Sequence, residues 1–393
     1  MAGPQYDLLL RGGEVIDPSQ GLHCRCDVAL AKGVIVAVSD DIPVSDAGRV
    51  IDVSGKLVTP GLIDIHGHFF HGSFPLAARA DEVCLPNGVT TGVDAGSSGW
   101  MNYPAFRDYV IPTCKTGVLA FLNLSGFGIG SPNLDMPGDL MDFRWASEER
   151  TIQRLEENRG RLLGIKVRIA HNACGKENAI PALKMARKVC DQTGTRLMVH
   201  VSGSPIPLSK ILEFLHPGDI VTHVYNGHPN GVLDSNRRVL PAVREAREAG
   251  VILDVAHAGT HLNNRVARTA VEQGLPPDTL STDMVDPKFP GRDPSRPTYY
   301  LPDVMSIFMA LGMSLEEVVK GVTWSAASAI GEEARIGSLR PGYPSDVAVL
   351  EQGEGQFDFP DMDGNHLPAT ERLVCKMTIR QGEVCLNRLS DNA

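Results

Sequence analysis

Histidines that could bind a metal ion end several short apolar segments of the chain. The run PGLIDIHGH carries His66 and His68 two residues apart, so both side chains lie on one face of an extended chain. The segments RLMVH and VTH end at His200 and His223, and STD ends at Asp283. Imidazole and carboxylate groups suit Zn²⁺ and related ions, and a catalytic site leaves coordination open for water. Four histidines and one aspartate can bind more than one cation.

A lysine lies in another apolar segment, LLGIKVRIA. A charged ammonium at Lys166 would be costly to bury there unless it is paired or chemically altered. A carbamate on this lysine would turn it into a carboxylate-like ligand that bridges two cations. Each feature is weak evidence alone, because single buried histidines and chance HxH pairs are common. Their conjunction within or at the ends of five of the chain's apolar segments predicts a metal site.

The elements that must position these residues alternate along the chain. From residue 57 onward, short runs rich in Val, Ile and Leu are separated by longer amphipathic stretches, which is typical of parallel strands joined by helices. We expect eight strands, at 57–65, 89–95, 117–124, 162–169, 196–201, 219–225, 251–256 and 279–282.

Eight such units predict an α/β fold, a (β/α)8 TIM barrel spanning residues 56–334. A doubly wound sheet is the alternative, but it usually has fewer strands and has a glycine fingerprint after its first strand. In a TIM barrel the active site lies at the carboxyl ends of the strands, where the candidate ligands occur. The two chain ends, 1–55 and 335–393, instead contain short strands with turn signals, and we expect them to form one small composite β-sandwich domain.

Composition restricts the classes of partner. The chain has 393 residues, of which 42% are hydrophobic and 21% charged, and its formal net charge is −10. A negative charge disfavours nucleic acid and anionic membranes, so a small-molecule substrate is expected. Eight scattered cysteines without a CxxC pair, and the lack of a long apolar run, favour a cytoplasmic protein with reduced thiols. Homo-oligomerisation is left open.

Several other residues are candidates for binding the substrate. Arg168 lies two residues after Lys166, so it projects to the same side of the strand and could bind a carboxylate through two hydrogen bonds. A salt bridge inside the barrel mouth is the alternative. Further candidates lie at or just beyond expected strand ends: His71, Ser97, Tyr225, Asn226 and His257. His171, His228 and His261 lie on loops or helix starts, where solvated histidines are the commoner case.

The chain resembles the amidohydrolase superfamily over nearly its full length. The resemblance is carried by RGGEVIDPSQG, VTPGLIDIHGH, GVTTGVDAGSSG and GSLRPGYPSDVAVL, together with the ligand pattern above. It implies one metal ion held by His66, His68 and Asp283, a second held by His200 and His223, and a carboxylated Lys166 bridging them. It also implies a metal-bound hydroxide that attacks a carbonyl carbon while Asp283 acts as the catalytic base. The ligand types and the availability of the ion favour zinc as the metal.

Within that superfamily, one departure bears on the substrate. Dihydroorotase and hydantoinase typically have an arginine shortly after the HxH pair, whereas Phe69, Phe70 and His71 follow it here. The chain is therefore more similar to the dihydroorotase-like deacetylases, which act on N-acyl amino acids or O-acetyl hydroxy acids. A cyclic amidohydrolase is the alternative enzyme. A non-catalytic scaffold of the same fold is disfavoured because every expected ligand type is retained.

Overall fold

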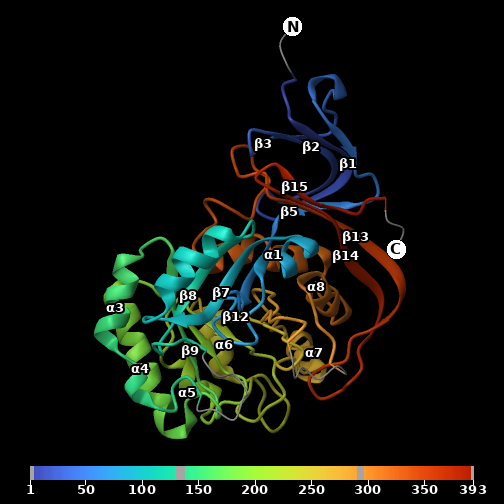
Figure 1. The fold of residues 1–393 in the computed structure, drawn as a ribbon. Coiled ribbons are helices and arrows are strands. Elements are labelled where there is room, and N and C mark those ends of the chain that lie inside the picture. The colour runs from blue at the N-terminus through green and yellow to red at the C-terminus, as the bar shows by residue number, and fades with distance from the viewer. Residues whose placement is uncertain (1–3, 130–137, 290–295, 391–393) are drawn as a thin grey trace.

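The computed structural model describes residues 4–129, 138–289 and 296–390. It consists of a barrel surrounded by helices and a smaller unit, built on a second sheet, at one end of it (Figure 1). The blue N-terminal strands and the red C-terminal strands lie together in the sheet of that smaller unit, here the small sheet. Segments from both ends of the sequence therefore build one sheet.

The small sheet has eight strands in the order β15-β14-β13-β5-β1-β2-β3, with β4 paired to β1. Its strands are β1 Leu8–Asp17, β2 Leu22–Ala31, β3 Val34–Ser39, β4 Val50–Asp52, β5 Leu57–Pro60, β13 Val347–Asp358, β14 Pro368–Arg380 and β15 Glu383–Asn387. Strand β5 links the two ends, because it pairs with β1 on one side and with β13 on the other.

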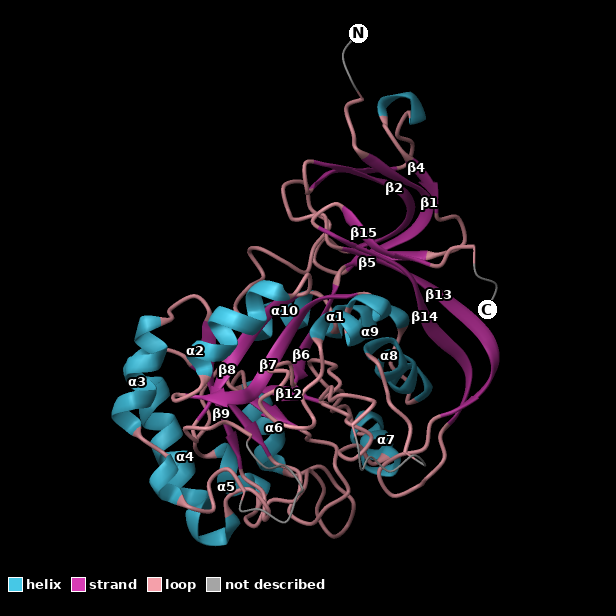
Figure 2. Cartoon of the chain, in the orientation of Figure 1, coloured by secondary structure: helices cyan, strands magenta, loops and turns pink. Residues whose placement is uncertain are grey.

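The barrel is a TIM-barrel fold with mixed α/β content. Seven parallel strands follow one another in sequence order: β6 Leu62–Gly67, β7 Val89–Gly99, β8 Gly117–Asn123, β9 Leu162–Arg168, β10 Arg196–His200, β11 Ile220–Thr222 and β12 Ile252–Asp254. Helices surround this sheet (Figure 2). They are α1 Ala80–Val83, α2 Tyr103–Ala105, α3 Glu148–Glu157, α4 Gly175–Thr193, α5 Leu208–Leu212, α6 Pro241–Glu248, α7 Asn264–Glu272, α8 Leu301–Ala310, α9 Leu315–Gly321 and α10 Trp324–Ile330.

Two expected strands differ from the structure in kind, and the two expected at 219–225 and 251–256 are shorter, since β11 and β12 have three residues each. The single strand expected at 57–65 is divided, because β5 ends at Pro60 in the small sheet and β6 begins at Leu62 in the barrel. The change of sheet occurs at Gly61, where a Cβ atom would lie only 2.2 Å from Thr90 Oγ1. The second difference is at 279–282, which forms no regular strand, although it occupies the eighth position of the barrel.

That eighth segment joins its two neighbouring strands through isolated β-bridges and a side-chain hydrogen bond. Thr279 forms a parallel bridge with Asp254 of β12, and Met284 forms one with Gly67 of β6. Between these bridges, the backbone N–H of Thr282 donates to the Asp64 carboxylate at 3.1 Å. A hydrogen bond to a side chain thus stands where a regular strand would have one to a backbone carbonyl. The segment is therefore held on both sides without the hydrogen-bond repeat of a strand.

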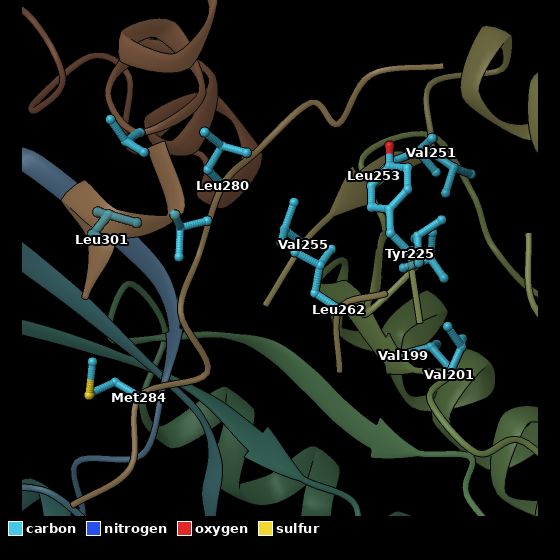
Figure 3. Close-up of a cluster of buried hydrophobic side chains, with 14 of the residues drawn as sticks. Val199, Val201, Tyr225, Val251, Leu253, Val255, Leu262, Leu280, Met284 and Leu301 are labelled. Atoms are coloured by element: carbon cyan, nitrogen blue, oxygen red, sulfur yellow. The ribbon is translucent and has the colours of Figure 1, made fainter. Parts of the chain in front are cut away.

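A large hydrophobic core lies between the barrel strands and the helices. Figure 3 shows part of it, with Val199, Leu253 and Val255 close to Tyr225 and Leu262. The small sheet encloses a separate cluster of buried apolar side chains, including Leu10, Val28 and Val349. Of the described helices, none is both long and apolar enough to cross a membrane.

The hairpin formed by β13 and β14 extends from the small sheet along the barrel, past α8 and towards α7 (Figures 1 and 2). At its tip, Asp361 accepts a hydrogen bond from the backbone N–H of Asn264 at 2.7 Å, and Asp363 accepts one from the Asn263 side chain at 2.7 Å. The hairpin tip therefore holds the chain at the start of α7, just after the loop that follows β12.

Candidate active site

The fold brings all the predicted metal ligands to one end of the barrel. His66 lies on β6 and His68 directly follows it, His200 ends β10, and His223 follows β11, so all four side chains meet at the carboxyl ends of the strands. Asp283 lies in the eighth segment and faces the same region. All of these residues are buried, with at most 7% of each exposed.

Asp283 lies between two groups of histidines. One of its oxygens, Oδ1, is 2.9 Å from His68 Nε2 and 3.4 Å from His66 Nε2. These three residues, the HxH group, offer ligand atoms that all lie within 4.8 Å of one another. The other oxygen, Oδ2, is 3.9 Å from His223 Nε2 and faces the second group.

The second group contains three histidines rather than two. His200, His223 and His261, the three-histidine group, also have ligand atoms within 4.8 Å of one another. The ring centroid of His223 lies 4.3 Å from that of each of the other two. His261 Nε2 is 3.6 Å from Asp283 Oδ2. His261 therefore belongs to the cluster, although a loop position predicted a solvated side chain.

Neighbouring oxygen atoms determine which ring nitrogens face the cluster. His223 Nδ1 is 2.8 Å from the Ala256 carbonyl oxygen, and His200 Nε2 is 3.0 Å from the Ser202 carbonyl oxygen. Because a carbonyl oxygen only accepts, each of these nitrogens carries a hydrogen and donates it. The opposite nitrogen of each neutral ring then has a free lone pair, which is the state that a metal ligand requires.

The cluster fits divalent cations. His223 Nε2 is buried and has no hydrogen-bond partner among the described residues. Burial holds the pKa values of His200 and His223 well below their usual range and lowers the pKa of His66 to about 4, so these rings are neutral near pH 7. Buried polar atoms are normally paired, so an unpartnered lone pair next to other nitrogens and a carboxylate is suited to bind a cation.

Lys166 lies on β9 beside the HxH group and is 1% exposed. Its Nζ is 2.9 Å from His66 Nε2 and 3.6 Å from Met198 Sδ. Burial lowers the pKa of Lys166 to about 7, so much of this amine is uncharged at neutral pH. Strand β7 passes close by at Gly96, where a Cβ would lie 2.8 Å from the Lys166 Cβ.

Arg168 is buried two residues further along β9. Its Nη1 donates to Asp139 Oδ1 at 3.3 Å, and Asp139 also accepts from the Asn123 side chain at 3.3 Å. The guanidinium is near enough to act on the cluster, since it adds to the effect of burial in lowering the pKa values of His200 and His261. The structure thus contains the salt bridge given above as the alternative to carboxylate binding, at a place adjoining the cluster.

The other substrate-contact candidates make contacts within the protein. Ser97 Oγ is 3.0 Å from His68 Nδ1, so it orients a candidate ligand. The Asn226 side chain donates to the His223 carbonyl oxygen at 2.8 Å, and His71 Nδ1 is 3.2 Å from the Ala77 carbonyl oxygen. Tyr225 is fully buried in the core, as Figure 3 shows, and its hydroxyl donates to the Leu275 carbonyl oxygen at 3.1 Å.

His257 and His261 occupy different surroundings. The His257 ring lies 4.4 Å from that of Tyr299, and its Nδ1 accepts a hydrogen bond from the Gly259 N–H at 3.0 Å. His261, four residues later, reaches the cluster instead. The signal that could have found it is its position in the loop after the seventh strand, since such loops build TIM-barrel sites.

The backbone around the cluster is strained at four non-glycine residues. His223, Ala256, Ala258 and Asp283 have φ values of 65°, 45°, 51° and 53°. Side chains with a Cβ rarely adopt this left-handed conformation, and it persists only where the surroundings enforce it. Its concentration at the ends of the sixth, seventh and eighth barrel segments is typical of a functional site.

The aromatic residues that follow the HxH pair have structural roles. The Phe69 backbone N–H donates to Asp94 Oδ2 at 2.7 Å, and its ring fills the space over Gly67. Phe70 stacks on Phe106 with ring centroids 4.9 Å apart. The two positions after the HxH pair are thus filled by buried aromatic rings.

Residues 57–384 match the family model described as the amidohydrolase family. The chain therefore belongs to the amidohydrolase family. The curated protein "Deacetylase Atu3266" of Agrobacterium fabrum is 31% identical over 333 residues, which cover 85% of this chain and 80% of that protein. A crystal structure titled as an adenine deaminase matches with a TM-score of 0.87 and 27% identity, covering 96% of this chain and 99% of that one. Another, titled as a dihydroorotase, matches with a TM-score of 0.85 and 27% identity, covering 97% and 99%.

Proposed function

We propose that the protein is a metal-dependent hydrolase that removes an acetyl group from an N-acyl amino acid or an O-acetyl hydroxy acid. The observation that carries this proposal is the buried cluster of histidines around Asp283 at the carboxyl ends of the barrel strands. The similarity to a protein named deacetylase, over most of both chains, favours this reaction within the amidohydrolase family.

Two divalent cations, which we propose to be zinc, would be held by this cluster. The proposed ligands are His66, His68 and Asp283 for one ion, His200 and His223 for the other, and a carbamate on Lys166 between them. When bound, such ions polarise a carbonyl group and lower the pKa of a water molecule. Nitrogen and carboxylate donors favour zinc over the harder cations.

The carbamate requires an uncharged amine. In its neutral form, Lys166 Nζ attacks the carbon of CO₂, a new N–C bond forms, and one proton leaves to solvent. The low pKa of this buried lysine supplies the neutral form at physiological pH. The product is an anion, which suits a site lined by neutral histidines and open to cations.

Asp283 would move the proton during the reaction. Its carboxylate takes a proton from the attacking water and delivers it to the departing amine or alkoxide. The position of Asp283 supports this role, because its two oxygens face the two histidine groups. Its left-handed backbone persists only where the surroundings enforce it, which is consistent with a carboxylate held in that orientation.

The substrate carboxylate would be bound by Arg168. Arg168 is 9% exposed as a residue, and its guanidinium adjoins the cluster and has one hydrogen bond to Asp139. The guanidinium N–H groups that do not bond Asp139 can donate to a second carboxylate. The aromatic residues in place of an arginine after the HxH pair support an open-chain substrate over a cyclic ureide.

Other parts of the proposal concern the molecule as a whole. We propose that residues 1–55 and 335–393 act as one unit, in which the small sheet curves into two layers around its buried cluster, as in a β-sandwich. The eight cysteines are free thiols, which supports a cytoplasmic location. The net charge of −10 supports a small-molecule substrate over nucleic acid.

The test is hydrolysis of a panel by the zinc-reconstituted protein. The panel contains N-acetyl-D- and N-acetyl-L-amino acids, O-acetyl hydroxy acids, dihydroorotate, hydantoins and adenine. Turnover confined to acetylated carboxylates is the expected result and gives the stereochemistry. Turnover only of the cyclic compounds would establish the alternative, a cyclic amidohydrolase or a deaminase. Silence across the panel would contradict the proposed substrate class.

A further inference from the structure

A third histidine stands beside the two proposed for the second metal position. We propose that His261 is a ligand of the cation held by His200 and His223, which makes that position a three-nitrogen site. The inference rests on the proposed function in requiring a cation there. It adds His261 to the four histidines, one aspartate and one lysine that the proposed function assigns as ligands.

The three rings are close enough to share one cation. One ligand atom of each of the three histidines lies within 4.8 Å of the other two. Nitrogens that share one zinc ion at about 2.1 Å are roughly 3.4 Å apart in a tetrahedral site. The three nitrogens therefore lie near the spacing at which one cation could hold them all.

Ser202 orients two of the three rings. Its carbonyl oxygen accepts the hydrogen of His200 Nε2 at 3.0 Å, and its hydroxyl oxygen lies 2.9 Å from His261 Nδ1. Both contacts engage the nitrogen that points away from the cluster. A metal-binding histidine is normally held in this way, with its second nitrogen bonded to a neighbouring oxygen.

Burial differs across the three-histidine group. The His223 side chain is fully buried, whereas 23% of the His261 side chain is exposed. The group therefore reaches from the buried barrel interior to the surface at His261, which is the side that water and substrate can approach. A catalytic cation needs such an open side for water and substrate. Asp283 Oδ2 borders the same position at 3.6 Å from His261 Nε2.

The experiment compares metal binding by the wild-type chain, His261→Ala and His171→Ala. His171 is an exposed histidine outside the cluster, so its variant controls for the loss of an imidazole. Metal-free proteins are titrated with Zn²⁺ and with Co²⁺, following heat and the visible spectrum of bound cobalt. Unfolding of the metal-free proteins confirms that each variant is folded.

The wild-type and His171→Ala chains are expected to bind two ions. The His261→Ala chain is expected to bind the first ion normally and the second at least about tenfold more weakly, with a changed cobalt spectrum. Free imidazole should restore the second affinity by entering the space left by the ring.

Two other results are informative. Unchanged affinity and an unchanged cobalt spectrum in His261→Ala, accompanied by a higher KM, would overturn the proposal and make His261 a substrate contact. Failure of the wild-type chain to bind any divalent cation would instead overturn the proposed function itself. The two failures are therefore distinguishable.

Discussion

Thr222 determines which nitrogen of His66 carries the hydrogen. The Thr222 hydroxyl donates to Asp254 Oδ2 at 2.7 Å and lies 2.9 Å from His66 Nδ1. Because its only hydrogen is directed at Asp254, the hydroxyl oxygen accepts from His66 Nδ1–H. The lone pair of His66 is then on Nε2, which faces Asp283 and Lys166.

The first prediction concerns the chain of hydrogen bonds from His66 through Thr222 to Asp254. Thr222→Val removes the acceptor of His66 Nδ1–H, and the affinity for the cation in the HxH group should fall about 10- to 100-fold. Thr279→Val is the matched control, because Thr279 also donates to Asp254, at 2.8 Å, but its hydroxyl has no contact with His66. Metal titration of the two variants measures the difference. Equal affinities would show that Thr222 does not orient the ligand.

The second prediction concerns the buried lysine. Lys166→Met replaces a buried amine with an apolar side chain of similar length, so the metal-free protein should be as stable as the wild type or more stable. Its turnover should be about 100-fold lower. Chemical denaturation and acetate release measure the two quantities. The account also expects Lys166→Ala to recover part of its activity in formate, whose carboxylate can take the place of the carbamate. A fully active Lys166→Met would contradict the bridging role.

The third prediction concerns acid stability of the metal-free protein. Burial lowers the pKa of His257 to about 4 from its ordinary value of 6.5. Between these two pH values the unfolded chain binds a proton that the folded chain does not, so the free energy of unfolding falls as the pH drops from about 6.5 to 4. This group alone should contribute ~3 kcal/mol, a contribution that is fully present above pH 6.5.

Denaturation of wild type and His257→Gln across this pH range checks that contribution. The variant should lose less stability on acidification than the wild type, because one titrating group has been removed. Parallel pH profiles would mean that His257 binds a proton equally well in both states.

The fourth prediction concerns the hairpin tip. Asp361→Ala leaves the buried backbone N–H of Asn264 without its acceptor, and stability should fall by roughly 1–3 kcal/mol. The loop that carries His261 should loosen, so binding of the second cation should weaken as well. Asp358→Ala, on the same hairpin but with a half-exposed side chain, is the control. If both variants bind the second cation as the wild type does, the hairpin does not support the site.

The sequence was most informative where strands are regular. Apolar runs that end in a histidine, as at His200, place that side chain at a strand end, and the parallel sheet then brings such ends together. The strand order and the shared end of the barrel strands could be expected on the same grounds, whereas the amidohydrolase assignment rested on a resemblance of motifs such as VTPGLIDIHGH. The strand order and the shared end follow from local periodicity and from the geometry of parallel barrels, so they could be predicted without coordinates.

Irregular backbone limited the rest. Counting side chains alternately along the seventh strand directs His257 to the site, but β12 ends at Asp254 and the left-handed residues Ala256 and Ala258 break the alternation. His261 reaches the histidine cluster instead. It lies in a loop whose path depends on contacts with the distant hairpin, such as that between Asn263 and Asp363. Pairing across about a hundred residues is not visible in local sequence.

The most direct test of the account is acetate release from acetylated carboxylates before and after removal of metal. We expect that a chelator abolishes turnover, that Zn²⁺ restores it, and that Asp283→Asn, reconstituted with Zn²⁺, stays inactive towards the substrate that the wild type hydrolyses. Turnover that survives complete removal of metal, or an Asp283→Asn chain that hydrolyses the substrate at the wild-type rate, would contradict it.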